Sequence, residues 1–189
     1  MKITFVAVSV PALQQVKIYE KRYHEKYPDR ILEINYFYVA GIDRTYLRES
    51  ENIFNRITES DIAVIDTMGA SEELQDIVRR GLEQCRGNKI VIGNTLREYL
   101  KLGSFSMSSM GNMMKKKTDG KPQKRTALDK MHRMRRMALM LGNALPFGVT
   151  KDMKNVFLLM DYWQQGTEQD ITSFMRLILR QYEIGRAHV

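Results

Sequence analysis

The sequence predicts an α/β fold: an open, mostly parallel sheet of about four strands, followed by a helical extension. Two observations favour this class. Over roughly the first hundred residues, nearly continuous β-branched runs alternate with amphipathic blocks, as in strands that helices cover on both faces. After residue 102 no strand pattern follows, and the later blocks have helical periodicity.

The first elements follow one another closely. ITFVAVSV, Ile3 to Val10, has the pattern of a buried strand, and Pro11 suits the first turn of a helix after it. RILEINYFYVA contains a second strand, from Ile31 to Ala40. Asp43 is then a candidate cap for the next helix.

Two further strand-and-helix blocks complete the first half. DIAVIDTMG, Asp61 to Gly69, is the third strand. Ser71 opens a capping pattern, S-E-E-L, for a helix that runs to about Gln84. KIVIGN, Lys89 to Asn94, is a fourth strand, and a short helix through Leu100 follows it.

Polar and small residues end the predicted strands. Right-handed crossovers bring these ends to one edge of the sheet, where flavodoxin-like and Rossmann-like folds bind ligands. The residues expected there are Ser9, Ala40, Gly41, Asp66, Thr67, Gly93, Asn94 and Thr95. Asp66 is either an acid or base for a ligand, or a carboxylate that orders a loop or caps a helix. Neither G-x-G-x-x-G nor G-x-x-x-x-G-K-[ST] occurs, so no motif supports a nucleotide site.

The second half of the chain changes character. The chain is divided into a sheet domain (1–102), a Gly/Ser/Met loop with a basic mobile stretch (103–126), a helical segment (127–182) and a tail (183–189). Thr150 and Thr167 are candidate helix caps, and Gly166 is the break between the last two helices.

Composition excludes several classes of protein. No apolar run of about 18 residues exists, so we expect no membrane span. The single cysteine, Cys85, excludes an internal disulfide and favours a cytoplasmic setting, with the thiol packed as a small hydrophobe. The three histidines lack partners at metal-ligand spacing, so we expect no metal site.

The net charge of +8 comes from one segment. Residues 115–136 contain ten lysines and arginines against two aspartates, and the rest of the chain is balanced. The segment lacks the interleaved aromatic residues that stack on bases, which disfavours nucleic-acid binding.

Three segments resemble landmarks of one protein family. KLGSFSMSSMG, Lys101 to Gly111, resembles an L-G-[ST]-F-S-M-x-x-L-G segment near the N-terminus of the large subunit of ATP-dependent metal chelatases, the magnesium chelatase H-type and cobaltochelatase N-type proteins. DYWQQGTEQDITSFM, Asp161 to Met175, looks like a later landmark of that family. SDIAVIDTMGASEEL, Ser60 to Leu74, is similar to its third-strand segment.

The resemblance extends from about Ile3 to Tyr182 and has departures. The family has leucine where Met110 stands and usually one more glycine where Gln165 stands. Its large subunits are also far longer, so the chain corresponds to an N-terminal fragment. EIGRAHV, residues 183–189, is what a common sequencing adapter gives when translated, and we expect it to be a non-native tail.

The resemblance implies a role in metal insertion. Large subunits of this family bind a tetrapyrrole, and Co²⁺ or Mg²⁺ is the substrate metal for a corrinoid or porphyrin ring in cobalamin or chlorophyll-type synthesis. Their partners are an AAA+ ATPase subunit, which holds ATP and Mg²⁺, and a subunit with a metal-dependent adhesion-type domain. The family's catalytic residues lie mainly beyond this region. No catalytic residue, metal ligand or bound cofactor is therefore assigned, and the fragment alone is not expected to be catalytic.

A contact with the ligand or a partner is expected at the first landmark, at Gly103, Ser104, Phe105, Ser106 and Met107. Its small residues allow close backbone approach, and Phe105 and Met107 offer apolar contact. The alternative is that Phe105 and Met107 anchor the segment in the core. Two other functions stay open: a stand-alone flavodoxin-like binding or regulatory module, and a nucleic-acid-associated module that uses residues 115–136.

Overall fold

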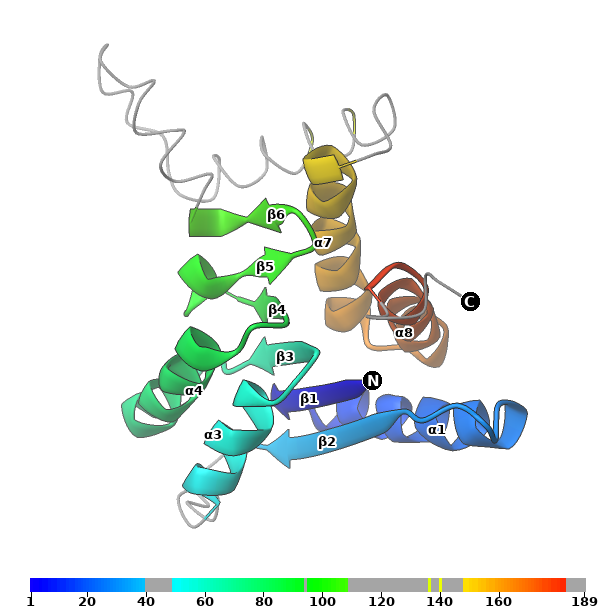
Figure 1. The fold of residues 1–189 in the computed structure, drawn as a ribbon, viewed down its shortest axis with the longest axis horizontal. Helices are drawn as coiled ribbons and strands as arrows, with labels where there is room; N and C mark the ends of the chain where they lie inside the picture. The colour runs from blue at the N-terminus through cyan, green and yellow to red at the C-terminus, as the bar shows by residue number, and fades with distance from the viewer. Residues whose placement is uncertain (40–48, 94, 109–135, 137–139, 141–147, 183–189) are drawn as a thin grey trace.

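Helices and strands alternate along most of the computed structural model, which describes residues 1–39, 49–93, 95–108, 136, 140 and 148–182 (Figure 1). The elements are β1 (Lys2–Ala7), α1 (Val10–Lys26), β2 (Glu33–Tyr38), α3 (Ser50–Thr58), β3 (Ile62–Asp66), α4 (Glu72–Gln84), β4 (Asn88–Ile92), the 3₁₀-helix η1 (Arg97–Tyr99), β5 (Lys101–Leu102), β6 (Phe105–Ser106), α7 (Gly148–Gln165) and α8 (Glu168–Tyr182). The candidate cap Asp43, most of the basic segment 115–136 and the tail 183–189 lie outside the described residues.

The described strands form one six-stranded sheet in the order β2-β1-β3-β4-β5-β6. The first four are parallel to one another, whereas β5 is antiparallel to both β4 and β6. The predicted α/β class, with a mostly parallel sheet followed by helices, is therefore confirmed. The predicted count of about four strands covers only the parallel part.

The hairpin of β5 and β6 corrects the sequence interpretation. A short helix was expected to run to Leu100 and a loop to begin at Gly103, but Lys101 pairs with Ser106 and Leu102 with Phe105. Leu102 and Phe105 are buried, so their side chains extend the core at this edge of the sheet. Strands of two residues are too short to show the alternation by which a strand is recognised. The predicted boundary after residue 102 thus falls inside the hairpin.

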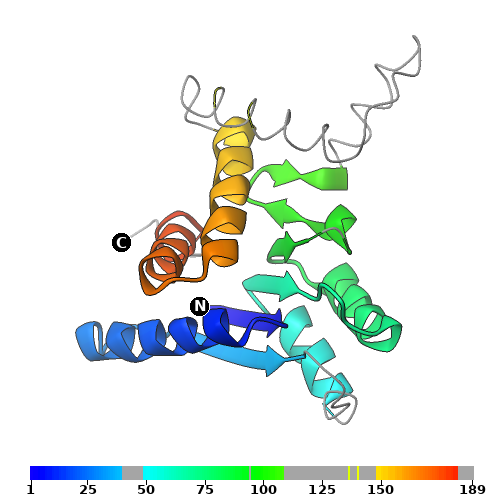
Figure 2. The same ribbon diagram turned by 180° about the vertical axis from the view of Figure 1, so that it is seen from behind.

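Helices cover both faces of the sheet (Figures 1 and 2). On the face covered by α3 and α4, the Thr4 hydroxyl donates to the carbonyl of Arg56 in α3 at 3.1 Å. On the face covered by α1, α7 and α8, the Phe5 ring lies 5.6 Å from the Trp163 ring and 6.3 Å from the Phe174 ring, centroid to centroid. The two C-terminal helices therefore pack onto the sheet and complete its second layer.

Side-chain caps fix most of the helix starts. Ser9 Oγ accepts from the amide of Ala12, and Ser71 Oγ accepts from the amide of Leu74. Leucine stands at Leu74, where a full capping box has glutamate or glutamine, so the sequence carries only the first half of that motif. Thr167 caps α8 as predicted, since its Oγ1 accepts from the amide of Asp170. Thr150 does not have its predicted place, because it lies inside α7, whose described part begins at Gly148.

Gly166 separates α7 from α8 as predicted. Its φ of +66° is in the left-handed region that glycine adopts readily after a helix end. Cys85 is also placed as expected, because its thiol is buried and lies 3.6 Å from the carbonyl oxygen of Ser60.

Asp61 ties together the amino ends of three parallel strands. Its carboxylate accepts from the backbone amide of Lys2 at 2.8 Å, and its own amide donates to the Lys2 carbonyl at 3.0 Å. Its carbonyl accepts from the amide of Asn88 at 2.8 Å. Gly87 approaches this backbone so closely that a Cβ added to it would lie 2.3 Å from the Asp61 carbonyl oxygen and 2.4 Å from that of Ser60.

We predict that Gly87→Ala lowers the free energy of unfolding by about 3 kcal/mol, because the new methyl group meets backbone that cannot move aside cheaply. Urea denaturation followed by circular dichroism measures this. Gly69→Ala is the matched control: Gly69 has a φ of +80° but open space around it, so only the backbone cost of about 1 kcal/mol applies. Equal losses in the two variants would contradict the prediction.

Candidate functional site

The strand order places the expected ligand edge between β1 and β3. The chain passes from β1 to β2 on one side and then returns to β3 on the other, so the crossovers diverge at the carboxyl ends of β1 and β3. In open α/β sheets such a switch point leaves a crevice where ligands bind.

Several of them are used by the fold itself. The Ser9 hydroxyl caps α1. Thr67 is 2% exposed, and its carbonyl accepts from the amide of Ala70 in a turn. Gly93 has a φ of +93°, and Thr95 is half-buried. Ala40, Gly41 and Asn94 lie outside the described residues.

Asp66 has a structural partner far along the chain. The Trp163 indole Nε1 donates to Asp66 Oδ2 at 2.8 Å, and both side chains are buried, with 6% of Asp66 and 3% of Trp163 exposed. The Trp163 ring also stacks on Phe5 of β1. The carboxylate therefore neither caps a helix nor faces an open crevice, because it fixes α7 to the end of β3.

The turn of the β5–β6 hairpin is fixed to α7. Ser104 donates from its backbone amide and from its hydroxyl to Oδ2 of Asp152, at 2.7 Å in each case. The Gly103 amide donates to Asn88 Oδ1 at 2.8 Å. Gly103 has a φ of +56° at the first position of a two-residue turn, where tight hairpins favour glycine. A Cβ there would lie 2.4 Å from Asp152 Oδ2, so no side chain fits.

The second oxygen of the same carboxylate reaches α8. The Tyr182 hydroxyl donates to Asp152 Oδ1 at 2.7 Å and accepts from the Asn155 side-chain amide at 2.8 Å. Burial, and then the hydrogen bond to the Asp152 carboxylate, raise the pKa of Tyr182 above its ordinary value of 10.0. Asp152 thus joins the hairpin, α7 and α8 in one network.

The five residues predicted for contact divide between surface and core. Gly103 and Ser104 are exposed on the turn. Phe105 is 2% exposed, and Met107 packs half-buried against the core, as the anchoring alternative expects. Ser106 Oγ lies 2.8 Å from Ser108 Oγ.

Sequence reasoning did not find Asp152, Asn155 or Tyr182. A signal was present: Asp152 and Asn155 are polar residues three positions apart in an amphipathic helix, and such pairs share one face. Their shared partner on α8 lies 30 and 27 residues away along the chain, which no local pattern reveals.

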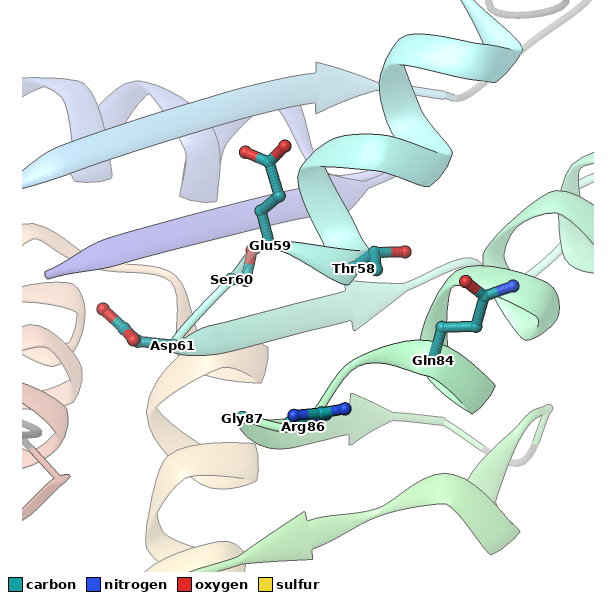
Figure 3. Close-up of a pocket in the computed structure, with 7 residues that line it drawn as sticks. All are labelled: Thr58, Glu59, Ser60, Asp61, Gln84, Arg86 and Gly87. Atoms are coloured by element: carbon teal, nitrogen blue, oxygen red, sulfur yellow. The ribbon is translucent and has the colours of Figure 1, made fainter.

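An open hollow of about 660 Å³ lies at the opposite, amino edge of the sheet. It is lined by Thr58, Glu59, Ser60, Asp61, Gln84, Arg86 and Gly87. Figure 3 shows that the longer side chains point in different directions and do not converge on one centre. Glu59 and Asp61 also bind Lys2, through its ammonium group at 3.4 Å and its backbone amide at 2.8 Å. This hollow has no arrangement suited to catalysis.

Within the described residues, no three side chains of histidine, cysteine, aspartate or glutamate are grouped so as to hold a metal ion. No helix in this part of the chain has the length and apolar character required to cross a membrane. Compared with models of known protein families and with curated proteins, the chain matches none. Within the described residues, the carboxyl edge of the parallel strands and the hairpin network are thus candidate places for function.

We predict that Trp163→Phe lowers the free energy of unfolding by about 3 kcal/mol, because the buried Asp66 carboxylate then loses its donor. Asp66→Asn is the matched control and costs about 1 kcal/mol, since its amide oxygen still accepts from the indole. Trp163 is the single tryptophan, so far-ultraviolet circular dichroism follows the unfolding of all three proteins. A smaller loss in Trp163→Phe than in Asp66→Asn would contradict this.

We predict that Tyr182→Phe lowers stability at pH 8 by about 1 to 2 kcal/mol but flattens the loss of stability above pH 10. Well below pH 10 the hydroxyl is protonated in the folded and the unfolded chain, so its contribution to stability is constant. Above that pH the unfolded chain ionises first, because the folded pKa of Tyr182 is raised, and folding is disfavoured. Urea unfolding between pH 8 and 11 measures the slope. The exposed Tyr38→Phe is the control, and an unchanged slope in Tyr182→Phe would refute the assignment.

Proposed function

We propose that the chain is the N-terminal part of the tetrapyrrole-binding large subunit of an ATP-dependent chelatase that inserts Co²⁺ or Mg²⁺ into a corrinoid or porphyrin ring. The observation that carries the proposal is that the segments with the family resemblance are joined in space. Asp66 of the third-strand segment binds Trp163 of the later landmark, 97 residues away. Ser104 of the L-G-S-F-S segment binds Asp152, in the helix that leads to that landmark.

These contacts give a physical reason for three separated segments to occur together. The third-strand segment supplies the buried carboxylate of Asp66, and the later landmark supplies the indole that donates to it. The first landmark supplies the hairpin turn, which requires glycine at Gly103. The three segments therefore belong to one packed structure. This supports a common fold with the family's N-terminal region, and the activity follows from that relationship.

In this proposal the chain acts by binding and positioning. The AAA+ ATPase subunit hydrolyses ATP, and energy is required because the hydrated ion and the ring both lose favourable partners before metal–nitrogen bonds form. No catalytic residue is assigned to the chain. Gly103 and Ser104, exposed on the hairpin turn, are the part of the first landmark proposed to contact ligand or partner, with Phe105 as the anchor beneath them.

A second candidate, a flavodoxin-like binding module, is favoured by one observation. The parallel strands have the order β2-β1-β3-β4, which matches the start of the flavodoxin order, where the flavin lies at the β1/β3 switch point. Titration with flavin mononucleotide tests it, and saturable quenching of flavin fluorescence would favour this function over the first.

The chelatase proposal is tested by reconstitution. The gene is expressed with an AAA+ ATPase subunit and an adhesion-type subunit of the chelatase family. ATP-dependent insertion of Mg²⁺ and of Co²⁺ is followed by absorbance in a metal-free porphyrin and a metal-free corrinoid. We expect insertion of one metal, lost without the ATPase subunit or with a non-hydrolysable nucleotide. No insertion in any combination would refute the proposal.

In the same assay, Phe105→Ala with Met107→Ala separates anchoring from contact. If these side chains only anchor the hairpin, ring affinity and turnover of the folded protein are unchanged while the free energy of unfolding falls by about 3 to 5 kcal/mol. A loss of ring affinity at unchanged stability would instead assign them to the contact.

A further inference from the structure

One cation in the described chain has a buried atom and no partner. The buried side-chain atoms without a hydrogen bond in this part of the chain are Gln15 Oε1 and Arg97 Nε, and only the second belongs to a charged group. Arg56 and Arg79, by contrast, pair with Glu33 and Asp76. Arg97 is thus a half-buried guanidinium with an unsatisfied buried donor and no ion pair among the described residues, an arrangement that stability alone disfavours.

The backbone that places Arg97 is strained. Arg97 begins η1, just after β4, at the carboxyl side of the parallel sheet. Leu96 before it has a φ of +59°, and it is the one described residue other than glycine with a positive φ. The Leu96 side chain is buried, so the core holds this conformation in place. Strain of this kind, next to an unsatisfied donor, is more typical of binding sites than of simple connections.

The same edge also offers an exposed apolar side chain. Met68, which follows β3, is 61% exposed, and its methyl group would lie 3.7 Å from a Cβ built on Gly93 at the end of β4. Gly93 has a φ of +93° and is four residues before Arg97. Met68, Gly93 and Arg97 all follow parallel strands on the carboxyl side of the sheet, so this side carries an exposed thioether as well as a cation.

We propose that Arg97 is an anion-binding residue at the carboxyl edge of the sheet and takes a carboxylate of the ligand. The planar guanidinium matches a carboxylate with two parallel hydrogen bonds. Burial lowers the pKa of the Arg97 guanidinium, and no carboxylate of the described residues opposes that effect, so an incoming anion would supply the counter-charge. The choice of ligand rests on the proposed function: a tetrapyrrole carries carboxylate side chains around a flat apolar ring, which suits Arg97 together with Met68.

The first experiment tests the anion site without any tetrapyrrole. The ¹⁵N-labelled protein is titrated with acetate, and with chloride as the control, at constant ionic strength. The signal followed is the Nε–H resonance of Arg97, which is assigned by its absence from the spectrum of Arg97→Met. We expect a saturable shift of that resonance and none for Arg86, the exposed arginine at the opposite edge. A resonance that does not respond to acetate would overturn the proposal.

The second experiment tests the ligand class by titrating the chain with a porphyrin dicarboxylic acid and with its dimethyl ester, read from Trp163 fluorescence. Arg97→Met should lose about ten-fold or more in affinity for the acid and nothing for the ester, with Arg97→Lys intermediate and Arg86→Met as control. The melting temperature of Arg97→Met should equal or exceed that of the wild type, because the substitution removes an unsatisfied buried donor. Unchanged affinity for the acid would overturn the carboxylate assignment. An acetate response without porphyrin binding would leave the anion site standing and count against the chelatase proposal alone.

Discussion

The hydrogen bond between Trp163 and Asp66 is the contact on which the joined arrangement of sheet and helices depends. A buried carboxylate is costly unless a donor satisfies it, and the donor comes from a helix almost a hundred residues later. The indole also stacks on Phe5 and packs beside Phe174, so one side chain supplies both polar and apolar contact. The sheet consequently depends on the C-terminal helices, because the buried carboxylate of Asp66 at the end of β3 requires the hydrogen-bond donor that α7 supplies.

Asp152 has the complementary role at the other end of α7. Its two oxygens bind the hairpin turn and the Tyr182 hydroxyl, so it fixes the sheet edge and α8 at once. Together with Trp163 it attaches α7 at both ends. The proposed function draws on this rigidity, since a positioning subunit must hold its ligand contacts in a defined geometry while its partners hydrolyse ATP.

Much of the fold was predictable because its signals are local. The buried runs around Phe5 and Val64 have the composition of central parallel strands, and Ser71, Thr167 and Gly166 mark helix ends through bonds within a few residues. The hairpin was missed because its strands are too short for periodicity. The site was predicted as a set of strand ends and as the segment from Gly103 to Met107. Whether a polar side chain at a strand end binds a ligand or packs in the core depends on residues far away in the sequence. The partner of Asp66 is Trp163, and no local sequence pattern connects the two.

The bond between Ser104 and Asp152 also has a topological consequence. These residues are 48 positions apart, so the chain that leaves the sheet after β6 returns to the place it left. The entropy of closing such a loop grows only with the logarithm of its length, about 0.6 kcal/mol for each doubling. The free energy that the contact between Ser104 and Asp152 must supply to close the chain therefore depends only weakly on how many residues lie between them.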